Sequence, residues 1–80
     1  MKIRIFLSWD SEVSAVWVGE VGDKFRNSSL PATVKPFGKF PNGDTRVGVT
    51  INDLSFIDEI AEALSLTCGE LLSCGAEVVN

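Results

Sequence analysis

The 80-residue chain contains no histidine, so the side chain that enzymes use most often as a general base is missing. Neither a glycine-rich phosphate loop nor a Gly-x-Ser-x-Gly nucleophile turn occurs in it. The helical carboxylates are expected to face water, where nothing raises a pKa. We therefore expect a protein that is not an enzyme, has no catalytic residues and needs no cofactor.

Cysteine is scarce, with only Cys68 and Cys74 present. On one helix these two residues would lie about 9 Å apart along the axis, too far for a disulfide. A zinc site requires more ligands than two cysteines without a histidine. The sequence thus predicts two reduced, at least partly buried thiols and no metal.

Long hydrophobic runs are absent too. No stretch approaches the roughly 18 to 20 apolar residues that cross a bilayer. The N-terminal residues Lys2 and Arg4 interrupt the apolar pattern that a secretory signal would need. Apolar residues make up an ordinary 45% of the chain. We expect one globular domain, residues 1–80, located in the cytoplasm and not in a membrane.

Basic residues stop at Arg46. Residues 47–80 carry six acids and no lysine or arginine, whereas residues 24–46 carry a net charge of +4. On a helical wheel, four of the acids fall within about 120° of one another. They are Asp58, Glu59, Glu62 and Glu70. These residues are predicted to bind a basic protein surface, although a solvated helix face is the simpler interpretation. A homodimer joining the two oppositely charged blocks is a further possibility.

Hydrophobic periodicity predicts an antiparallel sheet followed by a helix. The expected strands cover residues 2–9, Val13–Val21, Ala32–Phe37 and Arg46–Ile51. Residues 23–31 are expected to form the longest loop, and Asn42-Gly43 to form a type I′ hairpin turn. Residues 53–73 are predicted to form a helix, either continuous or broken at Leu66-Thr67. Residues 76–79 could add a last strand or simply dock on the fold. The fold class is therefore α+β, a meander of four to five antiparallel strands with a C-terminal helix on one face.

The same pattern predicts the core. The residues expected to be buried are Ile5, Leu7, Trp17, Val49, Ile57, Ile60, Leu64 and Leu71. Trp9 and Trp17 are interpreted as core residues on neighbouring strands, with interface anchors as the alternative. Phe6 lies on the polar side of the first strand, so it is either covered by another element or part of a surface patch.

Basic and aromatic residues alternate around the expected hairpin, at Lys35, Phe37, Lys39, Phe40 and Arg46. Aromatic rings interleaved with cations bind single-stranded nucleic acid by stacking and charge. Core phenylalanines separated by solvated lysines would give the same pattern. A nucleic-acid-binding module using residues 24–46 is therefore an alternative function.

In size, in charge layout and in the acids Asp58, Glu59, Glu62 and Glu70, the chain resembles the small acidic anti-CRISPR inhibitors encoded by phages. This resemblance implies a protein that blocks a nucleic-acid-binding complex by occluding or imitating DNA, with no direct nucleic-acid binding. The segments Met1–Leu7, Ala15–Val21 and Asp58–Leu64 are also similar to the strand-strand-helix layout of HicB-type antitoxins. That second resemblance implies a toxin-neutralising module.

Overall fold

The computed structural model describes residues 2–79, apart from the side chains of Cys68 and Leu72. Strand β1 covers Lys2–Trp9 and helix α1 covers Ser11–Asn27. Strands β2 and β3 cover Ala32–Lys39 and Thr45–Ile51. The C-terminal part contains a 3-10 turn, η1, at Leu54–Phe56, then α2 at Ile57–Ala63, α3 at Cys68–Ser73 and β4 at Ala76–Val79.

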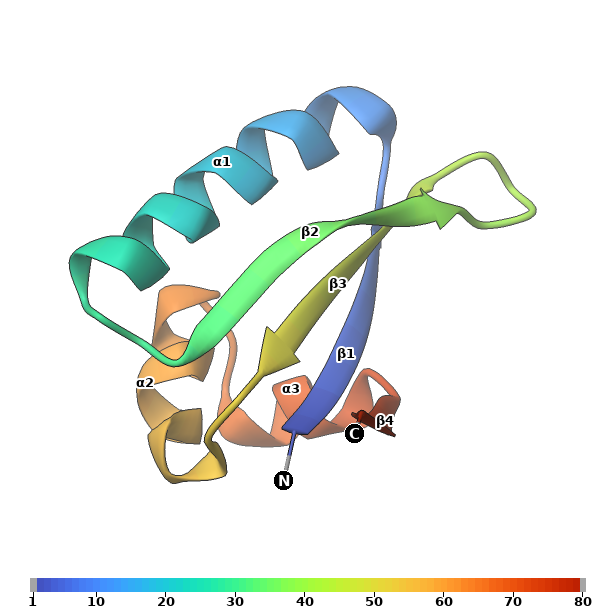
Figure 1. The fold of residues 1–80 in the computed structure, drawn as a ribbon. Coiled ribbons are helices and arrows are strands. Elements are labelled where there is room, and N and C mark those ends of the chain that lie inside the picture. The colour runs from blue at the N-terminus through green and yellow to red at the C-terminus, as the bar shows by residue number, and fades with distance from the viewer. Residues whose placement is uncertain (1, 80) are drawn as a thin grey trace.

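The four strands form one antiparallel sheet in the order β2-β3-β1-β4 (Figure 1). The expected α+β class and antiparallel sheet are confirmed, but the meander is wrong. Helix α1 connects β1 to β2, and β3 then inserts between those two strands. The resulting β-α-β-β-α-β order is that of the ferredoxin-like split arrangement. The expected C-terminal helix is not confirmed, since the last element is strand β4, beside the start of β1.

The strand predicted over Val13–Val21 is wrong, because these residues belong to α1. The Asp10 side chain caps the helix by accepting the Val13 N–H at 2.9 Å. Glu12 in the first turn and two cations in the last turn match the helix dipole. Ser14, Val21 and Phe25 are buried at helical spacing, so packing overrides the strand preference of the valines. The expected loop at 23–31 accordingly starts late, because the helix continues to Asn27.

All the helices lie on one face of the sheet (Figure 1). The core joins sheet residues with residues of α1, α2 and α3. Among the described side chains, the largest that are fully buried are Ile5, Ile51, Ile60, Leu71, Val47 and Val49. Five residues predicted to be buried are confirmed: Ile5, Val49, Ile60, Leu64 and Leu71. Leu7, Trp17 and Ile57 are only partly buried against this core. The opposite face of the sheet carries none of the helices that the structure describes.

Strands β2 and β3 form the hairpin that Asn42-Gly43 predicts. The Phe40 N–H donates to the Asp44 carbonyl at 2.9 Å and closes a loop of three residues. Gly43 has a φ of +91°, but Asn42 does not have a positive φ, so the turn is not of type I′. The register of β2 is irregular between Pro36 and Lys39, where Gly38 has a φ of +85°.

The continuous alternative for residues 53–73 is wrong, and the broken one is confirmed. Asp53 starts η1: it accepts the Ser55 hydroxyl at 2.7 Å, which holds the pKa of that carboxyl below its usual value. Helix α2 ends where Ser65 adopts a φ of +59°. Thr67 and Glu70 then form the capping box that begins α3. The apolar stripe continues across this break because both helices pack on the same core.

The two longer helices end in the same way. After α1, the Leu30 N–H donates to the Phe25 carbonyl, and after α2 the Leu66 N–H donates to the Ala61 carbonyl, each at 2.9 Å. This six-to-one bond defines a Schellman motif, which usually has glycine at the left-handed position. Here Ser29 and Ser65 occupy that position, with φ values of +52° and +59°. The following leucine packs against the core in both cases.

We expect Ser65→Gly to raise the free energy of unfolding by about 0.5 to 1 kcal/mol. A left-handed conformation costs a residue with a side chain about 1–2 kcal/mol, and glycine avoids this cost. Glycine also loses more conformational entropy on folding, which cancels part of the gain. Urea denaturation would measure the change. Ala15→Gly, at an exposed site within α1, should lower stability by about 1 kcal/mol instead. Equal signs for the two variants would contradict this account of the helix end.

Cys74 is a free, half-buried thiol after α3, in agreement with the prediction of a reduced and partly buried residue. Its Sγ lies 3.2 Å from the Glu70 carbonyl. The prediction for the Cys68 side chain lies outside the described residues.

Candidate functional site

The face of the sheet opposite the helices, here called the open face, carries alternate side chains of all four strands. Its rows follow from the strand register, in which Arg4 lies opposite Thr50 and Phe6 opposite Gly48. Residues that share a row point to the same side of a sheet. The open face comprises Lys2, Arg4, Phe6, Ser8, Thr33, Lys35, Phe37, Arg46, Thr50, Glu77 and Val79.

Two aromatic rings meet at the centre of the open face. Phe37 belongs to the edge strand β2, but its ring lies directly over Gly48 of β3. A methyl group at Gly48 would come within 2.4 Å of two ring carbons of Phe37. Phe6 of β1 contacts Phe37 edge to face, with ring centroids 5.7 Å apart. The absence of a side chain at Gly48 therefore brings the Phe37 ring over a central strand beside Phe6.

Cations are stacked against both rings. The Arg46 guanidinium carbon lies 3.8 Å from the centroid of Phe6, and that of Arg4 lies 4.5 Å from the centroid of Phe37. Lys35 Nζ lies 5.0 Å from the Phe37 centroid. Phe40, at the hairpin, is also within reach of Arg46 at 5.9 Å. Such pairs are attracted by the negative face of the ring, so the two rings and three cations form one layered cluster.

The two arginines of this cluster are held differently. Arg4 Nε donates to Thr50 Oγ1 at 3.0 Å, and its Nη1 lies 3.7 Å from Glu77 Oε1 in a salt bridge. Arg46 Nε is buried and, among the residues of the described chain, has no hydrogen-bond partner. Stacking on Phe6 thus positions Arg46. Its neighbour across the sheet is the uncharged Ser8, which does not neutralise its charge.

Charge is separated between the two sides of the molecule. The open face carries four cations, Lys2, Arg4, Lys35 and Arg46. Its carboxylates are Glu77 and, at the hairpin edge, Asp44, which accepts the Ser8 hydroxyl at 3.1 Å. The other nine acids of the chain lie on the helical side or in its connections. A protein of net charge −4 therefore presents a locally positive surface on its sheet.

The predicted partner-binding acids are only partly brought together. Asp58, Glu59 and Glu62 are exposed on α2. Glu70 lies on α3, where its carboxylate accepts the Thr67 N–H at 3.2 Å as part of the capping box. The helical wheel placed Glu70 with the other three because it assumed one continuous helix. The break at Ser65 removes that common face.

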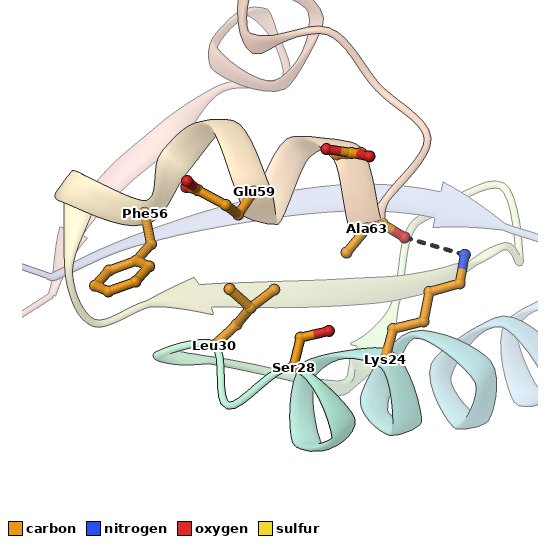
Figure 2. A pocket seen from close by; sticks show the side chains of 7 residues that line it. Lys24, Ser28, Leu30, Phe56, Glu59 and Ala63 are labelled. Carbon is orange, nitrogen blue, oxygen red and sulfur yellow. Dashed lines mark hydrogen bonds between the residues drawn. The ribbon is translucent and has the colours of Figure 1, made fainter.

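A hollow of about 490 Å³ lies between the end of α1 and α2. Leu30, Phe56 and Ala63 give it an apolar lining, with Glu59 on the helix above (Figure 2). Lys24 crosses one end and donates to the Ala63 carbonyl at 3.3 Å (Figure 2). This lysine neutralises the carbonyl end of α2, so its position is explained by the fold.

Sequence reasoning found part of the open face and missed the rest. Lys35, Phe37, Phe40 and Arg46 come together as the alternation predicted. Lys39 does not, because its ammonium donates to Ser11 Oγ at 2.9 Å on the helical side. Arg4 and Phe6 were not linked to this cluster. The sequence signal that could have linked them is Phe6 itself, because it interrupts the charged and polar residues on the polar side of β1.

Comparison with protein-family models, curated proteins and solved structures finds no match for this chain. Within residues 2–79, none of the helices is long and apolar enough to cross a membrane. The side chains that the structure describes, which do not include that of Cys68, form no cluster of three or more cysteine, aspartate or glutamate residues suited to a metal ion.

Proposed function

We propose that this protein binds single-stranded nucleic acid on the open face of its sheet. The observation that carries the proposal is the layered cluster of Phe6, Phe37, Arg4, Lys35 and Arg46 on a surface without a covering helix. Four-stranded sheets with aromatic side chains on the open face stack the bases of single strands in RNA-recognition modules, and guanidinium planes serve the same purpose. The fold adds only an analogy to this argument, which depends on the cluster itself.

Single strands fit this surface better than a duplex. Stacking requires bases that are not already stacked in a helix. The open face is a sheet without a protruding helix to enter a major groove. Its cations can contact phosphates, while the acids lie mainly behind the sheet. The net charge of −4 should nevertheless repel the strand at long range, so binding is expected to be moderate in strength and sensitive to salt.

Fluorescence anisotropy with labelled single-stranded RNA, single-stranded DNA and duplex DNA, at low and at moderate salt, tests the proposal. We expect Lys35→Glu on the open face to weaken single-strand binding about tenfold or more. Arg26→Glu is the matched control, because it changes the net charge equally but lies at an exposed position of α1. Similar losses in both variants, or no single-strand binding by the unchanged protein at low salt, would refute the proposal.

The exposed acids of α2 support a second candidate, a protein that binds and blocks a nucleic-acid-binding complex as small acidic anti-CRISPR inhibitors do. Asp58, Glu59 and Glu62 follow one another on a short helix, and Phe56 beside them is 40% exposed. Helical acids of one sign can occupy a basic groove. This candidate would be supported if the unchanged protein inhibits such a complex and the double variant Glu59→Lys/Glu62→Lys does not. The resemblance to HicB-type antitoxins loses its strand-strand-helix basis, because Ala15–Val21 lies in α1 and not in a strand.

A further inference from the structure

The N-terminal half of α1 exposes an apolar surface that the proposed function does not use. Val13 is 43% exposed, Val16 is 61% exposed and Trp9 at the end of β1 is 37% exposed. Trp17 joins them, since its ring centroid lies 5.7 Å from that of Trp9. A shallow groove lined by Glu12, Val13, Val16, Trp17 and Glu20 runs along this side of the helix. We call these six residues the α1 surface.

The core does not account for the α1 surface. Helix α1 contributes Ser14, Val21 and Phe25 to the interior, whereas Val13 and Val16 point away from it. Single exposed valines are common in soluble proteins. Two exposed valines beside the exposed Trp9 and the partly buried Trp17 form a contiguous patch instead, and such patches mark interaction sites. Trp17, predicted to be a core residue on a strand, lies on α1 and is only partly buried against the core. Trp9 was predicted to be a core residue too, but it is exposed at the end of β1, so that prediction is wrong.

Charge on the α1 surface restricts the partner. Among the described residues, the polar side chains that line the groove are Glu12 and Glu20, and none that lines it is basic. The cations of α1, Lys24 and Arg26, belong to its last turn. A two-fold contact between two copies centred on Val16 would bring Glu12 of each copy near Glu20 of the other. Those like charges oppose self-association, so the charge pattern fits a partner that supplies cations.

We propose that the α1 surface docks a basic amphipathic helix of a partner protein. The apolar stripe of such a helix would cover Val13, Val16 and the tryptophans, and its cations would pair with Glu12 and Glu20. Apolar anchors flanked by complementary charges are the usual features of a helix bound in a groove. Helix α1, at roughly 25 Å from a rise of 1.5 Å per residue, offers enough length for several turns of contact.

The α1 surface and the open face lie on opposite sides of the sheet, so one can be occupied without blocking the other (Figure 1). The proposed docking therefore stands independently of nucleic-acid binding. A protein that bound a single-stranded nucleic acid on the open face and a basic helix on the α1 surface would connect that nucleic acid to the partner protein.

An 18-residue synthetic helix of leucine and arginine, with leucines at i, i+3, i+4 and i+7 spacing, is a suitable probe. The chain has two tryptophans and both belong to the α1 surface, so intrinsic fluorescence reports directly on its occupation. We expect a saturable blue shift as the peptide displaces water from the rings. A peptide with glutamate in place of arginine should produce no shift.

Val13→Ala/Val16→Ala should weaken peptide binding about tenfold while leaving the fold stable, because alanine has the higher helix propensity. Glu12→Lys/Glu20→Lys should abolish binding. Glu59→Lys/Glu62→Lys is its control, since it also brings the net charge to zero but alters α2. Binding that responds equally to both reversals would overturn the proposal, as would a missing blue shift with the arginine peptide. A dimer in sedimentation that the valine variant dissociates would identify a second copy as the occupant and overturn it as well.

Discussion

Replacing Gly48 by alanine is expected to lower the free energy of unfolding by about 1 to 3 kcal/mol, the usual cost of inserting a methyl group into filled space. The new Cβ would lie 2.4 Å from two ring carbons of Phe37, so the ring must move. Phe37 would then lose its edge contact with Phe6 and its position beside Arg4. Urea denaturation followed by tryptophan fluorescence would measure the loss, and single-strand binding should fall in parallel.

The double variant Gly48→Ala/Phe37→Ala provides the control. Without the ring, the methyl group at position 48 has space, and alanine is no worse than glycine within a strand. The double variant should therefore be more stable than the two single losses predict, by about 1 kcal/mol or more, as expected for residues in contact. Strict additivity would show that Phe37 does not depend on Gly48 for its place.

Arg46→Ala is expected to weaken binding of single-stranded RNA or DNA about tenfold to a hundredfold. Stacking of one base is worth about 1 to 3 kcal/mol, and the variant loses both the guanidinium plane over Phe6 and its charge. The dependence of affinity on salt should also fall, because each lost phosphate contact on a single strand reduces the slope by about 0.7. Anisotropy titrations at several salt concentrations measure both quantities.

Two further variants separate stacking from charge. Arg46→Lys retains the charge but not the plane, so it should keep the salt dependence of the unchanged protein while binding more weakly. Arg26→Ala removes an exposed arginine from α1, where it pairs with Asp23, and should leave affinity nearly unchanged. An equal loss in Arg26→Ala and Arg46→Ala would mean that net charge, and not the open face, controls binding.

The sequence predicted the local features of the sheet well and its connections less well. Alternation in β1 and β3 and the Asn42-Gly43 signal all depend on neighbouring residues. The error lies at Val13–Val21, where β-branched residues favour a strand but Asp10 and the spacing of Ser14, Val21 and Phe25 favour a helix. Because α1 takes the place of a strand, the order of strands in space could not follow from a chain of hairpins.

Prediction of the site was limited by the same dependence on distant contacts. Residues of the hairpin are close in sequence, so their common face could be inferred from the alternation of Lys35 and Phe37. Arg4 and Phe6 join that face only through the pairing of β1 with β3, which the sequence does not specify. The acids of residues 53–73 were instead placed on a common face that the fold does not keep. Ser65, at a left-handed position, breaks the helix without the glycine that usually signals such a break.

The pairing of β1 has a consequence for how quickly the chain reaches this fold. Ile3 pairs with Ile51 on one side and with Val78 on the other, whereas β2 and β3 are joined by a short turn. Hairpins close in about 1 to 10 μs, but pairing between distant segments must first overcome the entropy of large loops. The β2–β3 hairpin should thus form early, and the inner edge of β3 should stay unpaired until β1 pairs with it. The pairing of β1 with β3 should therefore be the slow step of folding, and β4 can pair with β1 only after it.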